Sequence, residues 1–307
     1  MIKYTFKRIL VGILTLFILA SITFFMMKAI PGNPFSQDNK VLTPDAYAVL
    51  EAKYGLDKPI FEQYVVYMNN VVTGDFGESI SKKGQFVGDI VLKRAPVTAK
   101  LGAVAFVIAL VVGIALGIVS ALTKKRWVNG LITAFATIGV SVPSFLLAIL
   151  AMIVFGVILG WVPLVGLKSP IYYVLPSIAL ALNPISMITR LTRSSLRDVM
   201  NKDYIILARS KGTSEIWVII KHGLKNAILP VVTYCGPMFA MLVTGSFVIE
   251  SLFSIPGIGA EFTSSVINRD YPLIMGLTIF LGALVIIMNI LSDVASAVID
   301  PRIKLGK

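Results

Sequence analysis

Residues Asp203–Pro230 read DYIILARSKGTSEIWVIIKHGLKNAILP and lie between two long hydrophobic blocks. The stretch is polar and basic where its flanks are apolar, which is typical of a loop at a membrane surface. Within it, Ala208 and Gly212 stand four residues apart, a spacing that places two side chains on one face of a helix. We therefore predict a short, rigid helix over 203–213, with a notch of small residues that lets a partner protein approach closely.

The composition is that of a membrane protein. Of the 307 residues, 56% are hydrophobic and only 14% are charged, whereas a soluble domain carries roughly 25% charged residues. The apolar residues form continuous blocks, which favours helices over an alternating transmembrane barrel. We predict an all-α polytopic membrane protein with six transmembrane helices, at about 9–30, 101–122, 131–160, 171–190, 227–250 and 272–297. Prolines interrupt the third and fourth blocks.

The distribution of charge predicts the orientation of the chain. The net charge is +12, and the whole excess falls on the side that holds the N-terminus, the loop before 131, the basic stretch 190–225 and the C-terminus. Positive residues concentrate in cytoplasmic loops, so both termini are expected in the cytoplasm. The basic excess then reflects topology and contact with membrane lipid, and it does not indicate a nucleic-acid partner.

The segment 31–98 is too polar to cross a membrane. Thr43 before Pro44 predicts a helix start, and Gly55 predicts its end. A second helix is predicted from Pro59 to Val72 with one apolar stripe, made of Phe61, Tyr64, Val65, Met68 and Val72. The glycines that follow predict a loop. Two interpretations remain open: an outer cap that seats a delivery partner, or a connector packed on the outer helix ends.

The hydrophobic core offers no catalytic or metal-binding constellation. His222 is the only histidine and Cys235 the only cysteine, so neither a nucleophile–base pair nor a His/Cys metal cluster is predicted. No GxxxxGK[ST] phosphate loop is present, so the chain is not expected to hydrolyse nucleotide itself. Prolines beside polar residues can line a pathway, because they free backbone carbonyls. The candidate translocation path comprises Ser141, Pro143, Ser144, Asn183 and Pro184.

The basic loop resembles the coupling-helix motif of bacterial ABC importer permeases. Its peptide-permease form is matched by Tyr204, Ala208, Arg209, Lys211, Gly212, His222, Leu224, Lys225, Asn226 and Ala227. The chain departs from the general motif at Ile206, which replaces a Glu, and at Lys225, which replaces a Pro. Further resemblances run along the chain, at Ala29–Pro34, Tyr54–Pro59, Gly74–Ser79, Phe253–Gly259, Arg269–Pro272 and Asp300–Ile303. Together they resemble the first of the two permeases of the oligopeptide/dipeptide (and nickel) ABC importer family.

The resemblance implies a type I ABC importer permease fold in the bacterial inner membrane. It implies a homologous second permease, two cytoplasmic ABC ATPases that carry ATP and Mg²⁺, and an extracytoplasmic binding protein that delivers peptide. No cofactor is expected on this chain. The coupling residues would be Asp203, Tyr204, Ala208, Arg209, Ser210, Lys211, Gly212 and Thr213. ATP-dependent closure of the ATPases would drive alternating access and import of oligopeptides.

The expected organisation and the alternatives follow from this. We divide the chain into a first membrane helix (1–30), an extracytoplasmic segment (31–98), a permease core (99–297) with a coupling loop (191–226), and a cytoplasmic tail (298–307). Dipeptide or nickel import remains an alternative within the family. A secondary transporter acting alone would need buried acids and an internal repeat, and an intramembrane enzyme would need paired catalytic groups. The sequence shows none of these features.

Overall fold

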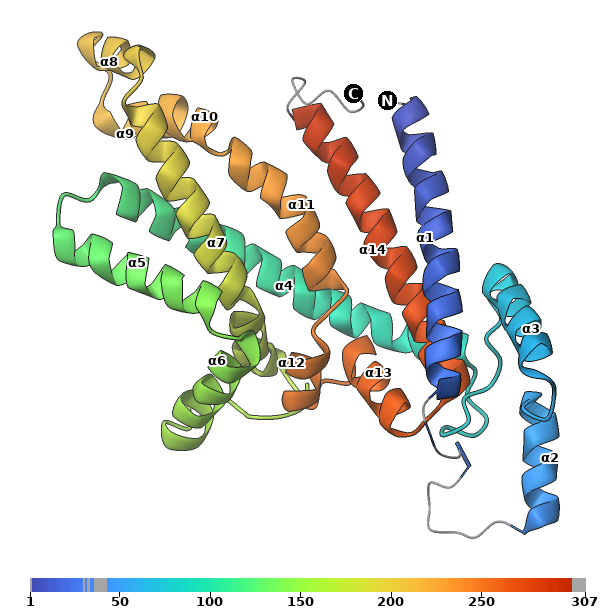
Figure 1. The fold of residues 1–307 in the computed structure, drawn as a ribbon. Coiled ribbons are helices and arrows are strands. Elements are labelled where there is room, and N and C mark those ends of the chain that lie inside the picture. Colours follow the sequence, from blue (N-terminus) through green and yellow to red (C-terminus); the bar gives the residue numbers. More distant parts are fainter. Residues whose placement is uncertain (1, 30, 32–33, 36–42, 300–307) are drawn as a thin grey trace. The chain divides into compact units, whose positions relative to one another are not determined.

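The computed structural model describes residues 2–29, 31, 34–35 and 43–299, and over these residues the chain is helical without a strand. The tail prediction (298–307) lies almost entirely outside the described residues. Figure 1 shows long helices joined by short connections, with the short helices α8 and α9 at the end of α7.

The element boundaries locate the predicted segments. The α-helices are α1 (Ile2–Ala29), α2 (Pro44–Tyr54), α3 (Ile60–Thr73), α4 (Val87–Leu122), α5 (Arg126–Ser141), α6 (Ser144–Ala151), α7 (Val174–Met200), α8 (Asp203–Ser210), α9 (Glu215–Trp217), α10 (Lys225–Ala227), α11 (Leu229–Val243), α12 (Phe247–Leu252), α13 (Ile258–Ile267) and α14 (Tyr271–Ile299). Two π-helical segments, η1 (Met152–Ile158) and η3 (Val218–Leu224), and a 3₁₀ turn, η2 (Pro170–Tyr173), complete them.

The polytopic membrane fold is confirmed. Four helices are long and apolar enough to span a membrane, at Phe6–Ala29, Val87–Leu122, Pro170–Met200 and Tyr271–Val294. Two bent pairs raise the number to six if each counts as one span: Arg126–Ser141 with Ser144–Ile158, and Glu215–Ala227 with Leu229–Val243. Each predicted block therefore has a counterpart, although the boundaries differ.

The predicted interruption of the block 131–160 at Pro143 is confirmed. The helical segments Arg126–Ser141 and Ser144–Ile158 are bent by 114° at this break. Pro143 has no N–H to continue the hydrogen-bond ladder, and it restricts the preceding residue to extended conformations. Val142 accordingly adopts φ −91° and ψ 131°. The fifth block is shorter than predicted, because α11 ends at Val243 and a left-handed glycine, Gly245, follows.

The chain divides into two compact units, residues 1–98 with 256–287, and residues 99–255 with 288–307. Two of the three boundaries fall inside α4 and α14, and the third lies between α12 and α13. The segment predicted as a single core, 99–297, is thus shared between the units, because residues 256–287 have their contacts with the N-terminal part.

In the first unit, the predicted caps of the outer helices are confirmed. The Thr43 hydroxyl accepts a hydrogen bond from the N–H of Ala46, Pro44 opens α2, and Gly55 ends it at φ +63°. α3 ends at Gly74, with φ +73°. α4 begins at Val87, inside the segment predicted as a loop, so that only 74–86 is irregular.

The predicted apolar stripe of α3 is confirmed at Tyr64 and Met68 and wrong at Phe61, Val65 and Val72. The buried side of α3 consists of Tyr64, Tyr67, Met68 and Val71, which pack with Ala20 and Phe24 of α1. Phe61, Val65 and Val72 are 75%, 52% and 84% exposed. The sequence offers apolar residues on two sides of this helix, and Tyr64 is drawn to α1 by a hydrogen bond between its hydroxyl and that of Ser21 at 2.7 Å.

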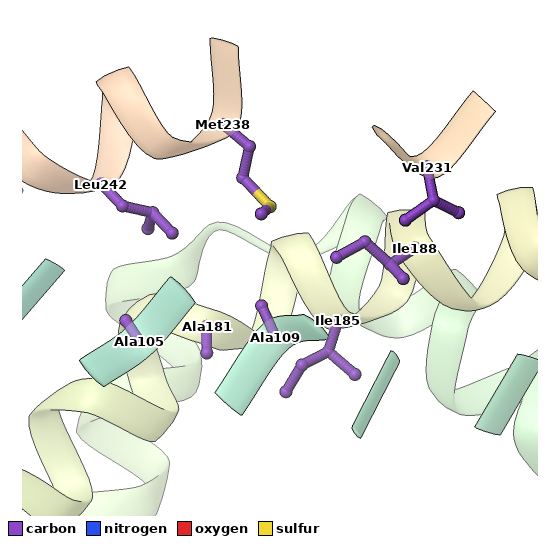
Figure 2. Packing of buried hydrophobic residues seen from close by; sticks show 8 residues of the cluster. All are labelled: Ala105, Ala109, Ala181, Ile185, Ile188, Val231, Met238 and Leu242. Carbon is purple, nitrogen blue, oxygen red and sulfur yellow. The ribbon is translucent and has the colours of Figure 1, made fainter. Parts of the chain in front are cut away.

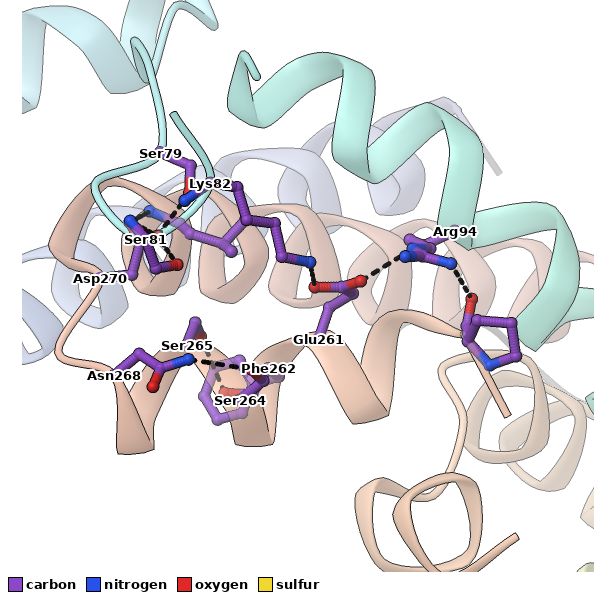
Figure 3. Close-up of polar contacts among 12 residues, drawn as sticks. Ser79, Ser81, Lys82, Arg94, Glu261, Phe262, Ser264, Ser265, Asn268 and Asp270 are labelled. Atoms are coloured by element: carbon purple, nitrogen blue, oxygen red, sulfur yellow. Dashed lines mark hydrogen bonds and ion pairs between the residues drawn. The ribbon is translucent and has the colours of Figure 1, made fainter. Parts of the chain in front are cut away.

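Two buried carboxylates hold the irregular segment 74–86 in place (Figure 3). The Asp270 carboxylate is fully buried and accepts hydrogen bonds from the N–H groups of Ile80, Ser81 and Leu273, at 3.0 to 3.2 Å, and from the hydroxyls of Ser79 and Ser81. It therefore caps α14 and anchors the loop at once.

The second carboxylate, Glu261 of α13, is paired with two cations. It forms ion pairs with Lys82 and with Arg94, the latter at 2.8 Å (Figure 3). Arg94 also donates to the backbone carbonyl of Pro256 at 3.2 Å. A buried carboxylate is tolerated only when charges and donors satisfy it, so α13, the loop and the start of α4 are fixed to one another.

The core of the second unit is built from small residues facing branched ones (Figure 2). Ala105, Ala109, Ala181, Ile185, Ile188, Val231, Met238 and Leu242 form the buried cluster. Small residues of α4 face α7, because a Cβ atom at Gly113 would lie 2.8 Å from the side chain of Ile188, and one at Gly117 would overlap Thr192. These glycines let α4 and α7 pack closely.

We expect Asp270→Ala to loosen the first unit. The substitution leaves three backbone N–H groups and two hydroxyls without their acceptor, at a cost of about 2–4 kcal/mol for buried donors of this kind. The melting temperature of the purified complex should fall, and proteolysis within 74–86 should accelerate. Asp57→Ala, at an exposed position, serves as the control. An unchanged melting temperature and cleavage rate for Asp270→Ala would contradict the anchoring role.

Candidate functional site: the α8 docking hairpin

The helix α8 and the turn after it form a hairpin between α7 and α9, which we call the α8 hairpin (residues 201–217). Asp203 lies in the first turn of α8, where a negative charge interacts favourably with the helix dipole. Gly212 adopts φ +76°, and its N–H donates to the Arg209 carbonyl at 2.9 Å. The left-handed glycine ends the helix, as glycines at this position commonly do.

An apolar cluster fixes α8 to the rest of the second unit. Ile205 and Val218 are fully buried and pack with Ala208, and Val199 and Met200 of α7 lie against them. Burial of a side chain such as Ile205 stabilises by roughly 1.5–3 kcal/mol. The side of α8 that bears Ile205 and Ala208 is therefore an internal contact.

Close backbone contact and hydrogen bonds complete the attachment. Gly223 lies in η3, where a Cβ atom would sit 3.1 Å from the sulfur of Met200 and 3.2 Å from Leu196. Asn226 donates from its side-chain amide to the Tyr204 hydroxyl at 3.2 Å. π-helical segments such as η3 are rare and occur often at functional sites.

An exposed ion pair closes the turn of the hairpin. Arg209 donates to both carboxylate oxygens of Glu215, at 3.1 Å and 2.6 Å. Both side chains are exposed to solvent, which screens the pair, so it contributes little to stability. It orients the turn, whereas the apolar cluster supplies most of the stability.

The predicted notch of Ala208 and Gly212 on one helix face is wrong. Ala208 is 7% exposed and faces its own chain, and Gly212 lies beyond the helix end with a left-handed backbone. The spacing rule holds only while the helix continues through both positions, and the helix stops at Ser210. The coupling role itself stays a prediction for Asp203, Tyr204, Ala208, Arg209, Ser210, Lys211, Gly212 and Thr213.

The exposed surface of the α8 hairpin is apolar and basic. Ile206 and Leu207 are each 56% exposed on α8, and Ile216, Trp217 and Ile220 are exposed on the next segment. Lysines at 202, 211, 221 and 225 are exposed on the same stretch of chain, and we call these four the basic rim. Exposed apolar side chains accompanied by basic ones are typical of a protein contact surface. The sequence could have identified Ile206 and Leu207, since they lie on the opposite side of α8 from Ile205 and Ala208.

The predicted path residues lie at the place where α5 meets α7. Ser141 ends α5, and Pro143 and Ser144 open α6. Two residues before Ser141, a Cβ atom at Gly139 would lie 3.2 Å from the Leu182 carbonyl. The Ser141–Ser144 motif and the Asn183–Pro184 motif therefore lie close to each other. Asn183 is exposed and Pro184 is buried, and their role in a path stays a prediction.

A polar stripe on α7 went unrecognised in the sequence. The exposed residues of this helix recur every three or four positions from Asn183 onward, at Met187, Arg190, Ser194 and Arg197. Beside the stripe, Arg193 donates to the Thr133 hydroxyl of α5 at 2.7 Å. A cavity of about 170 Å³ lies between the two helices and is lined by Thr133, Thr137, Arg190 and Arg193 among others.

Comparison with solved structures defines the class of the fold. A chain of the methionine ABC transporter MetNI in inward-facing conformations aligns over 69% of this chain and 96% of its own length, with a TM-score of 0.54 and 17% identity. A chain of an amino acid ABC transporter aligns over 70% of this chain and 95% of its own, with a TM-score of 0.50 and 15% identity. The fold is that of an ABC transporter membrane subunit.

Sequence comparison then gives the family. Residues 113–305 match the family described as "Binding-protein-dependent transport system inner membrane component", and residues 1–102 match the N-terminal family of such membrane components. The chain belongs to this family of permease subunits, and it is a multi-pass inner-membrane protein.

Several relatives are similar over their full length. The dipeptide transport system permease protein DppB of Bacillus subtilis is 42% identical, over 100% of this chain and 99% of its own. The oligopeptide transport system permease protein OppB is 41% identical in Haemophilus influenzae and 43% identical in Salmonella typhimurium, in each case over 99% of this chain and 100% of the relative.

Gly212→Ala should destabilise the end of the hairpin. No atom lies within 4 Å of the position of a Cβ at Gly212, so the whole effect comes from the left-handed backbone, at about 1 kcal/mol. Hydrogen exchange over 203–214 is expected to accelerate severalfold. The matched control is Gly130→Ala in α5, which has equal space and an ordinary helical backbone and should not accelerate exchange. Equal behaviour of the two variants would contradict the assignment of the turn.

Proposed function

We propose that this chain is the permease subunit of an ATP-driven importer that carries oligopeptides into the cytoplasm. The observation that supports the substrate class most directly is the similarity of 41–43% over the full length to permeases named for oligopeptide and dipeptide transport. The proposal names oligopeptides, and dipeptide import is the alternative within the same class. Nickel import is a more distant alternative.

The α8 hairpin is proposed as the surface that receives a cytoplasmic ATPase. Three features support it: an apolar centre of Ile206 and Leu207, a basic rim, and firm attachment to α7 through Ile205 and Val218. A short helix that is pinned in this way moves together with α7 when its outer side is pushed. ATP and Mg²⁺ belong to two such ATPase partners, because the sequence has no phosphate-binding loop.

The orientation of the chain in the membrane and the position of the transport path are proposed from the same arrangement of helices. The N-terminus, the C-terminus and the α8 hairpin are proposed to face the cytoplasm, in line with the positive charges near them. A homologous permease would contribute the other half of the channel, and an extracytoplasmic binding protein would deliver the peptide. The exposed polar stripe of α7, from Asn183 to Arg197, suits a water-filled pathway that alternates in its access.

Purification followed by reconstitution tests the whole proposal. The chain should purify from its native membrane together with a second permease and two ATPases. Proteoliposomes of this complex, with the binding protein added, should take up a labelled pentapeptide only when ATP is inside with the ATPases. Better uptake of dipeptides or Ni²⁺ than of the pentapeptide would change the proposed substrate to that compound. Uptake by the chain alone without ATP would overturn the proposal.

A single substitution in the hairpin tests the docking surface. Leu207→Asp places a charge in the apolar centre without touching the internal cluster, so the hairpin should stay folded while ATPase binding weakens. We expect ATP-dependent uptake to fall at least about tenfold, the equivalent of about 1.4 kcal/mol. Leu207→Met keeps an apolar side chain and should preserve uptake. Normal uptake by Leu207→Asp, at equal membrane expression, would show that the hairpin surface is not needed for coupling.

A further inference from the structure

The first unit contains a cavity that the proposed import mechanism does not use. Its volume is about 410 Å³, within the range of small-molecule sites. It lies among α1, α2, α3, the loop 74–78 and the start of α14. Most of its wall is apolar and aromatic, contributed by Phe24, Met27, Tyr67, Phe76, Tyr271 and Met275.

One wall of the cavity carries a cation without a carboxylate partner. The Lys28 ammonium donates to the side-chain oxygen of Gln63 and lies 5.8 Å and 5.4 Å from the ring centres of Phe24 and Tyr271. No acidic side chain in the described part of the chain pairs with it. An enclosed charge of this kind calls for a counter-charge.

The acid on the cavity wall is already engaged. Glu78 pairs with Lys53 at 2.7 Å and accepts a hydrogen bond from the N–H of Gly84. The hydrogen bond from Lys53 lowers the pKa of Glu78, so this side chain is a carboxylate that balances Lys53. Among the described residues that line the cavity, Lys28 therefore leaves a positive charge, and an anion is the ligand that would neutralise it.

A second group on the wall lacks a partner. Tyr67 is 4% exposed, and its hydroxyl is buried without a hydrogen bond. Burial raises the pKa of Tyr67, so its hydroxyl keeps the proton and remains a donor. A buried hydroxyl without an acceptor is destabilising, and an oxygen of a bound anion would supply one.

The surroundings of the cavity indicate that the anion comes from lipid. α3 packs against Ala20 and Phe24 of the spanning helix α1. Ala20 lies nine residues before the end of that span at Ala29, or roughly 13 Å along the helix axis. α3 therefore reaches the depth of the membrane boundary. Its outer side, with Phe61, Val65 and Val72 exposed, suits contact with hydrocarbon.

We propose that this cavity binds the headgroup of an anionic phospholipid. The phosphate would lie beside the Lys28 ammonium and accept from the Tyr67 hydroxyl, and the acyl chains would run over the apolar side of α3. A free phosphate ion is also an anion, but it would make no favourable contact with a wall of aromatic and methionine side chains. The bound lipid would hold α3 to the outer ends of α1 and α14.

The test compares lipid retention by the assembled complex. The complex is purified in a neutral detergent, exposed to equal amounts of phosphatidylglycerol and phosphatidylcholine, and analysed by native mass spectrometry. Wild type should retain phosphatidylglycerol selectively on this chain. Lys28→Gln should weaken that retention at least about tenfold, as expected for loss of a charged hydrogen bond, while Lys28→Arg should retain it. The matched control is Lys83→Gln, at an exposed position of the same outer segment.

Two further measurements keep the result interpretable. Tyr67→Phe preserves the ring and removes the hydroxyl, so it should fold normally and retain less phosphatidylglycerol than wild type. Inorganic phosphate at millimolar concentration should not displace the lipid, and displacement would show a free-anion site. A photoreactive acyl chain should label the peptide that contains α3. Equal retention of phosphatidylglycerol by Lys28→Gln and Lys83→Gln, or equal retention of both lipids by wild type, would overturn the proposal.

Discussion

Packing of Ile205, Ala208 and Val218 against the end of α7 is the contact on which the docking hairpin depends. α8 has eight residues, and a helix that short is unstable in water unless it is packed against something. The internal cluster of Ile205, Ala208 and Val218 stabilises this short helix. It also determines which side of α8 is exposed. Since one side of α8 is committed to α7, its other side, with Ile206 and Leu207, is free for a partner. Force applied there would reach Asn183, about 25 Å from the end of the continuous helix α7.

The charged side chains of the first unit differ in whether the chain itself supplies their partners. Asp270 and Glu261 are buried, and each is fully satisfied, by five hydrogen bonds and by two cations respectively. Such groups fix one arrangement of the loop, of α13 and of the start of α14. Lys28 is half-buried in the same unit, and no carboxylate among the described residues pairs with it. This difference from Asp270 and Glu261 is consistent with a bound anion beside Lys28.

Features that depend mainly on neighbouring residues in the sequence, such as helix caps and long apolar blocks, were predicted from the sequence. The Thr43 cap, the glycine end of α2 and the loop that begins at Gly74 were correct, and each predicted membrane span has a helical counterpart with other boundaries. The errors arose where tertiary contacts choose between similar local options. α3 has apolar residues on two sides, and only contact with α1 decides which is buried. The Ala208–Gly212 spacing suggested a notch, but the helix ended between the two residues.

The central claim is that the outer side of α8 is the surface that meets the transport ATPase. The most direct measurement replaces Leu207 with a photoreactive phenylalanine analogue, irradiates native membranes and identifies the cross-linked partner by mass spectrometry. The account predicts an adduct with an ABC ATPase from position 207, and none from position 28 in the outer unit. Cross-linking of position 207 to lipid alone, with the ATPases present in the same membranes, would contradict it.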